Sequence, residues 1–129
     1  MARYRLVRPA EAKIEAALSY SLAHYGRDAA ARYQALIYQA ISDLATNLPT
    51  LLQRGIAKAR DGLIIYPLRA SRRNVPGAIG MVGNPRGFIV GRLDDTGVLL
   101  VLTFVGEGML DANVVKDARA SEAEDKRTG

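Results

Sequence analysis

Arginine is the residue type in this chain most suited to binding chemistry. Between Arg54 and Arg92 the sequence holds eight basic residues and one acidic residue, Asp61, in a chain of net charge +5. A guanidinium pairs bidentately with carboxylate or phosphate, so this local excess indicates an anionic partner, either nucleic acid or an acidic protein surface. The alternative is a set of solvated charges that keeps the protein soluble. We expect the binding surface to consist of Arg69, Arg72, Arg73, Arg86 and Arg92.

Cleavage of RNA at such a surface would also need a base for the 2′-hydroxyl and an acid for the leaving oxygen. His24, the one histidine, falls on a predicted helix opposite its apolar stripe, where we expect it to be exposed. Tyr66 is expected in the core or at a sheet edge, and Glu107 lies between two glycines with no evident partner. The sequence therefore favours binding over catalysis, and no catalytic residue is assigned.

Metal, cofactor and membrane roles find little support in the composition. The chain has no cysteine and one histidine, so disulfides and thiolate metal sites are excluded and a zinc site is not indicated. The longest apolar run, Val98–Leu102, is far shorter than the ~20 residues that span a bilayer. Arg3, Arg5 and Arg8 are not followed by the apolar stretch of a signal peptide. We expect a cytoplasmic protein with no cofactor and no membrane partner.

The first half of the chain predicts a strand and two helices. Residues Arg3–Val7 alternate as a short strand, and Pro9 suits the first turn of a helix that runs to Tyr25. Gly26 can then take a left-handed conformation, and Asp28 can cap a second helix. Apolar residues recur at steps of three and four along both helices, at Ile14, Ala17, Leu18, Ser21, Leu22 and Tyr25, and at Ala30, Tyr33, Leu36, Ile37, Ala40, Ile41 and Leu44.

Pro49 limits the second helix, which we expect to end near Thr46 or Asn47. The second half predicts three strands, with a turn at Asp94–Gly97 between the last two and a glycine-rich loop over Gly77–Gly87. The expected strands are Leu63–Leu68, Gly87–Leu93 and Gly97–Val105.

The order β-α-α-β-β-β predicts an α+β protein. The helix hairpin would pack on one face of a small, mainly antiparallel sheet, and the first strand must join that sheet to stay ordered. The length supports one domain, expected over residues 1–115. Residues 116–129 carry four basic and four acidic side chains and are expected to form a charged tail, either helical or disordered.

Several of these segments together resemble the RelE/ParE family of toxins. The resemblance includes Ala10–Ser21 and Tyr25-Gly26, and it covers roughly residues 3–111. It continues through Ala30, Tyr33, Leu36, Ile41, Leu44-Ala45 and Pro49, then Arg69, Arg72-Arg73 and the strand pair Gly87–Val105. The pattern of Tyr20 and Gly26 is closer to the ParE branch than to the RelE branch. The resemblance implies the toxin of a type II toxin–antitoxin module, which binds and inhibits DNA gyrase and is neutralised by a ParD-like antitoxin.

Two further readings stay open. RelE-like relatives cut mRNA on the ribosome, but the family's histidine on the last strand is replaced here by Gly106, and Asp111 falls one residue late after Met109. The third reading is a non-toxic relative that only binds a partner, because glycines at 91, 106 and 108 would weaken the last two strands.

An antitoxin would need an apolar surface, and one apolar cluster follows the second helix. It consists of Leu48, Leu51, Leu52 and Ile56. An amphipathic helix or an added strand is the usual occupant of such a surface. The residues either extend the core or contact the antitoxin, and we expect about half of them to be core.

Overall fold

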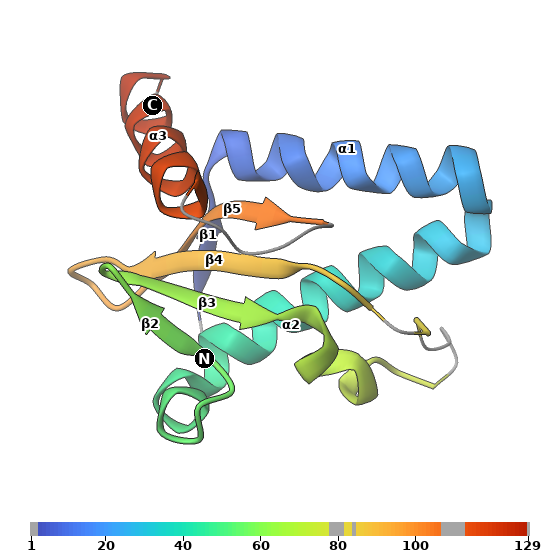
Figure 1. Cartoon of the computed structure of the whole chain (residues 1–129), viewed down its shortest axis with the longest axis horizontal. Coiled ribbons are helices and arrows are strands. Elements are labelled where there is room, and N and C mark those ends of the chain that lie inside the picture. Colours follow the sequence, from blue (N-terminus) through green and yellow to red (C-terminus); the bar gives the residue numbers. More distant parts are fainter. Residues whose placement is uncertain (1–2, 78–81, 84, 107–112, 129) are drawn as a thin grey trace.

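A five-stranded sheet with two long helices against it forms the body of the molecule (Figure 1). The computed structural model describes residues 3–77, 82–83, 85–106 and 113–128. Within them the elements are β1 (Tyr4–Leu6), α1 (Arg8–Tyr25), α2 (Arg27–Gln53), β2 (Lys58–Arg60), β3 (Leu63–Pro67), the 3-10 helix η1 (Leu68–Asn74), β4 (Phe88–Leu93), β5 (Leu99–Val105) and α3 (Asn113–Thr128). The expected α+β class is confirmed.

The sheet has the order β1-β5-β4-β3-β2. All neighbouring strands are antiparallel except β1, which runs parallel to β5 with Tyr4 opposite Leu99. The first strand therefore joins the sheet as expected, at the edge next to the last strand. In Figure 1, α1 runs beside β5 and α2 lies behind the sheet.

The two long helices meet at Gly26, whose φ of +90° lies in the left-handed region that the sequence predicted. Pro9 sits in the first turn of α1, where its missing N–H removes no helical hydrogen bond. The prediction that Asp28 caps the second helix is wrong. The helix begins at Arg27 with Gly26 as its N-cap, and Asp28 lies in the first turn.

The second helix continues past its predicted end. Asn47 has non-helical angles (φ −118°, ψ 21°), and the chain resumes as helix to Gln53. Pro49 falls in the first turn after this kink, where proline is tolerated. The prediction of an end near Thr46 or Asn47 thus located the break correctly but missed the two turns beyond it.

The core lies between α2 and the sheet. The predicted stripe of α2 is buried at Leu36, Ile37, Ala40, Ile41 and Leu44, and it packs with the buried strand residues in one cluster. The stripe of α1 is only partly confirmed. Ile14 and Ser21 are buried, but Leu22 and Tyr25 near the end of the helix are exposed.

The β4–β5 pair contains an irregularity that depends on Gly91. Val90 faces Thr103 but Gly91 faces Val101, so Leu102 is an extra residue on β5. A Cβ at position 91 would lie 2.3 Å from the backbone oxygen of Leu100. The glycine that the sequence suggested would weaken the strand is therefore required by the close approach of β5.

The turn between β4 and β5 is formed as predicted. Asp94 Oδ1 accepts hydrogen bonds from the backbone N–H of Thr96 and of Val98, and Gly97 has a φ of +83°. The predicted loop Gly77–Gly87 lies partly outside the described residues.

Two elements, β2 and η1, were not predicted, and for the C-terminal residues the helical alternative is the one found. Residues expected as a charged tail form the helix α3, whose Val114, Ala118 and Ser121 are buried. These three residues lie at steps of four and three, so they form one face. That face contacts β5 and α1. The helix α3 therefore packs on the same core as α1, α2 and the sheet.

Candidate anion-binding site

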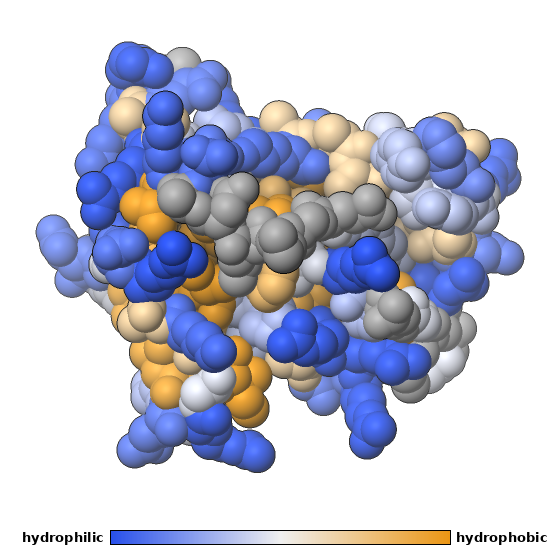
Figure 2. Space-filling view, viewed as in Figure 1, coloured by the Kyte–Doolittle hydropathy of each residue, from blue (hydrophilic) through white to orange (hydrophobic). Residues whose placement is uncertain are grey.

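A groove of about 700 Å³ lies beside β3, between the end of α2 and η1. Its apolar wall comes from Ile56, Ile65, Pro67 and Phe88. Four cationic side chains complete the lining: Lys58, Arg69, Arg72 and Arg73. We call this feature the basic groove. Figure 2 shows hydrophilic residues next to apolar ones on the face of the molecule turned toward the viewer.

The four cations of the basic groove have no ion-pair partner in the part of the chain that the structure describes. Arg72 is half-buried, and its Nε is enclosed without a hydrogen-bond partner in the described part of the chain. Leaving a buried donor unsatisfied costs about 1–3 kcal/mol, and more when the group is charged. A groove with these properties is suited to carboxylate or phosphate groups supplied from outside.

Asp43 on α2 binds two side chains of η1, the element that carries Arg69, Arg72 and Arg73. Its Oδ2 accepts hydrogen bonds from Ser71 Oγ at 2.5 Å and Asn74 Nδ2 at 2.8 Å. Its Oδ1 accepts one from Gln39 Nε2 at 2.8 Å. Ser71 is fully buried directly beside Arg72, so the Asp43 carboxylate attaches η1 to α2 next to the arginines of the groove.

Tyr66 belongs to the same network. Ser71 gives its single hydroxyl proton to Asp43, so the 2.7 Å contact between Ser71 Oγ and Tyr66 Oη has the tyrosine as donor. Burial raises the pKa of Tyr66, and the negative charge of Asp43 raises it further, whereas the Ser71 hydrogen bond lowers it. A buried phenol that keeps its proton and donates it to Ser71 is not available as a base.

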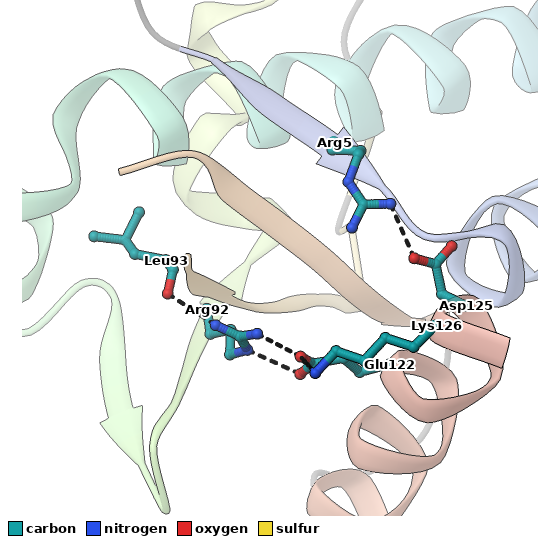
Figure 3. Close-up of polar contacts among 6 residues, drawn as sticks. All are labelled: Arg5, Arg92, Leu93, Glu122, Asp125 and Lys126. Carbon is teal, nitrogen blue, oxygen red and sulfur yellow. Dashed lines mark hydrogen bonds and ion pairs between the residues drawn. The ribbon is translucent and has the colours of Figure 1, made fainter. Parts of the chain in front are cut away.

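Arg92 does not line the basic groove. It stands four residues beyond Phe88 on β4, and α3 holds it there (Figure 3). Its Nε donates to Glu122 Oε1 at 2.8 Å, its Nη2 pairs with Glu122 Oε2, and its Nη1 donates to the Leu93 carbonyl. Arg92 is thus separate from the three arginines of the groove, and its guanidinium is already paired with Glu122 of α3.

A second ion pair fastens the same helix. Arg5 Nη1 donates to Asp125 Oδ2 at 2.9 Å, and the backbone N–H of Arg8 donates to the other oxygen at 3.3 Å. Lys126 lies 3.3 Å from Glu122 (Figure 3). The helix α3 is thus attached to β1, to the start of α1 and to β4 by charged contacts as well as by its buried face.

The attachment of α3 gives a prediction about pH. The hydrogen bonds from Arg92 and then the charge of Lys126 hold the pKa of Glu122 at about 2, below its usual 4.5. A lowered folded-state pKa stabilises the fold above about pH 4.5, and this stabilisation disappears as the pH falls toward 2. We expect the free energy of unfolding of the Glu122→Gln variant to fall less steeply over this range than that of the wild type, in urea titrations at each pH.

Asp117→Asn is the matched control, because Asp117 is exposed on the same helix and takes part in none of the ion pairs described. The free energy of unfolding of this control should fall with pH as steeply as that of the wild type. Equal slopes for Glu122→Gln and the wild type would show that the Arg92 pair adds no stability.

Arg86 also lies apart from the basic groove. It lines a different hollow at the far end of the helix hairpin. Three of the five arginines expected at the binding surface, Arg69, Arg72 and Arg73, therefore line the basic groove together, whereas Arg86 and Arg92 lie outside it. The groove gains Lys58 from β2, a strand that the sequence pattern did not predict.

The four apolar residues proposed to contact an antitoxin divide into core and surface. Leu48 is buried in the core, which removes it from any partner surface. Leu51 and Ile56 are half-buried against the core, and Ile56 also lines the basic groove. Leu52 is 36% exposed. The expectation that about half of them are core agrees with this arrangement.

The residues considered for catalysis are not gathered at the groove. His24 is exposed on α1, where its Nδ1 donates to the Tyr20 carbonyl oxygen at 2.9 Å and its ring stacks on Tyr20. Glu107, Met109 and Asp111 lie outside the described residues. No acidic residue and no histidine lines the basic groove among the described residues.

No known family model matches the sequence, and no curated protein is similar to it at a significant level. Over the described ranges, no group of three or more histidine, aspartate or glutamate side chains is placed to hold a metal ion. No helix in the same ranges has the length and apolar character needed to cross a membrane.

Proposed function

We propose that this protein is a ParE-like toxin of a type II toxin–antitoxin module, which binds and inhibits DNA gyrase through the basic groove. The observation that carries the proposal is the set of four cations around an apolar floor with no ion-pair partner in the described chain. Binding without catalysis requires only such a shaped, charged surface. Arginine and apolar side chains together are typical of the central part of protein–protein contacts.

The same groove gives less support to an mRNA endonuclease. Cleavage would need a proton acceptor and a proton donor beside the cations. Among the described residues, the lining of the groove contains neither a carboxylate nor a histidine, and Tyr66 has its hydroxyl committed to Ser71. Inhibition by binding is therefore the mechanism that we propose.

A ParD-like antitoxin is the partner that would neutralise this toxin. Leu52 is exposed at the end of α2, and Ile56 contributes to both the core and the groove. An amphipathic antitoxin segment that contacted Leu52 and Ile56 would lie across the entrance to the groove and exclude gyrase from it. Arg72 and Arg73 would then contact acidic side chains of the antitoxin in place of the target.

Expression of the full chain alone in bacteria tests the proposal. We expect growth arrest with induction of the DNA-damage response, and inhibition of gyrase supercoiling by the purified protein. In the double variant Arg72→Glu, Arg73→Glu, inhibition should weaken by about a hundredfold or more, since each lost charged contact is worth about 1.5–3 kcal/mol.

Arg27→Glu, Arg127→Glu is the matched control, because both residues are exposed and lie outside the groove while the charge change is the same. Arrest with rapid loss of mRNA would favour cleavage instead. A folded protein that causes no arrest would contradict the toxin proposal, and equal inhibition by both double variants would remove the groove from the mechanism.

A further inference from the structure

The hollow that contains Arg86 is separate from the basic groove and is used by no part of the proposed function. It has a volume of about 660 Å³, within the range of pockets that hold small ligands. It lies between the connected ends of α1 and α2, the chain that enters β4 and the end of β5. Figure 2 shows the hairpin end of the molecule on the right.

Small residues keep this hairpin-end hollow open. Ala17, Ser21, Ala29 and Gly106 all line it. A Cβ at Gly106, the residue after β5, would lie 3.3 Å from Phe104 Cε2 and 3.5 Å from Tyr33 Oη, so the chain passes close to the helix hairpin at this point. A side chain at position 106 would crowd Phe104 and reach van der Waals contact with Tyr33.

Three tyrosines border the hollow, and two of them have no role in the core. Tyr20 is 54% exposed and Tyr25 is 67% exposed. Their ring centroids are 6.5 Å apart in an edge-to-face arrangement, and Tyr20 is also stacked on His24 at 3.9 Å. Tyr33, in contrast, lies with its ring against Phe104 of β5. A planar ligand can stack on such rings, and each stacked base is worth about 1–3 kcal/mol.

Two arginines give the hollow a positive charge. Arg32 comes from α2 and Arg86 from the segment before β4, and both line it. Neither takes part in an ion pair within the described residues, and no carboxylate lines the hollow there. Two guanidinium groups on different elements are suited to the several oxygens of a phosphate.

We propose that the hairpin-end hollow binds a nucleoside monophosphate, with the base stacked among the tyrosines and the phosphate held by Arg32 and Arg86. A free phosphate would use only the arginines, and a neutral aromatic molecule would use only the tyrosines. A mononucleotide uses both groups of residues at once, and its size fits the volume. The site does not depend on the proposed function, because the two sets of lining residues do not overlap.

Calorimetric titration of the full chain with the common ribonucleoside monophosphates tests the site. Adenosine and inorganic phosphate are titrated separately, because each represents one half of the proposed ligand. We expect at least one mononucleotide to bind about tenfold or more tightly than either half. Arg32→Gln and Tyr20→Ala, which change partly and largely exposed side chains, should each lower the affinity about tenfold without changing thermal unfolding.

Arg27→Gln is the matched control, because Arg27 lies on the same helix and does not line the hollow. It should bind as the wild type does. The proposal is overturned if no mononucleotide binds, if phosphate alone binds as tightly, or if Arg32→Gln and Arg27→Gln behave alike. Binding of oligonucleotides that strengthens with length and ignores Arg32 would also overturn it.

Discussion

Replacing Gly91 with alanine is expected to destabilise the fold by about 3 kcal/mol, although only a methyl group is added. The new Cβ would lie 2.3 Å from the Leu100 backbone oxygen and 3.3 Å from its carbonyl carbon, distances at which the backbone itself must move. Gly91 sits where the β4–β5 register shifts, in the centre of the sheet. Urea unfolding of the full chain, followed by circular dichroism, measures the loss.

Gly77→Ala is the control for this substitution. Gly77 has open space around it and no left-handed φ, so its variant should stay within about 0.5 kcal/mol of the wild type. Equal stability of the two variants would contradict the close packing of β5 against β4. The hypothesis of a non-toxic relative rested partly on the expectation that Gly91 weakens β4. A large loss of stability in Gly91→Ala would remove that support.

Replacing Asp43 with alanine is expected to cost about 3 kcal/mol of folding free energy and to release η1 from α2. The substitution leaves Ser71, Asn74 and Gln39 without their common acceptor, and Ser71 is fully buried. A hydrogen bond to a charged group contributes about 1.5–3 kcal/mol, and a buried unsatisfied donor adds a penalty. Urea unfolding gives the loss of stability, and amide hydrogen exchange in residues 68–74 reports the release of η1.

Asp28→Ala removes an exposed carboxylate from the same helix and should cost less than about 1 kcal/mol. Asp43→Asn keeps the shape of the side chain, so its loss of folding free energy should lie between those of Asp43→Ala and Asp28→Ala. If the network positions the arginines, gyrase inhibition should weaken in Asp43→Asn under conditions where the protein stays folded. Full inhibition by a folded Asp43→Asn protein would show that Asp43 serves stability alone.

The helix hairpin could be predicted because its signals are local. Leu36, Ile37 and Ile41 recur with the helical period, and Gly26 supplies the left-handed residue between the helices. The same period in α1 over-predicted burial at Leu22 and Tyr25, because the sheet does not extend to the hairpin end. The strands β3, β4 and β5 are apolar on both faces, so their positions were predicted but not their register.

The elements that were missed are those fixed by distant contacts. The strand β2 has three exposed residues and no apolar alternation, and it exists because it pairs with β3. The helix α3 has few apolar residues, so its composition suggested a tail. Its order depends on burial of Val114 and Ala118 and on pairs such as Arg92–Glu122 between residues far apart in the sequence.

The candidate site was predicted by residue type more reliably than by position. Arg69, Arg72 and Arg73 are close in sequence and share η1, so they had to lie together. Arg86 and Arg92 could be placed only by knowing where β4 begins and what covers it. Asp43 and Ser71 carried no sequence signal, because their roles appear only when α2 meets η1. Charge excess therefore predicted the chemistry of the groove, and the fold decided which cations form it.

The parallel pairing of β1 with β5 has a consequence for synthesis on the ribosome. The partner of Tyr4 is Leu99, so the first strand must wait for most of the chain before it can be hydrogen-bonded. At that stage α2 has already been synthesised, but the sheet that covers its apolar stripe is not yet complete. Until Leu99 has been synthesised, β1 cannot form these hydrogen bonds, so we expect part of the apolar surface of the nascent chain to stay exposed up to that point.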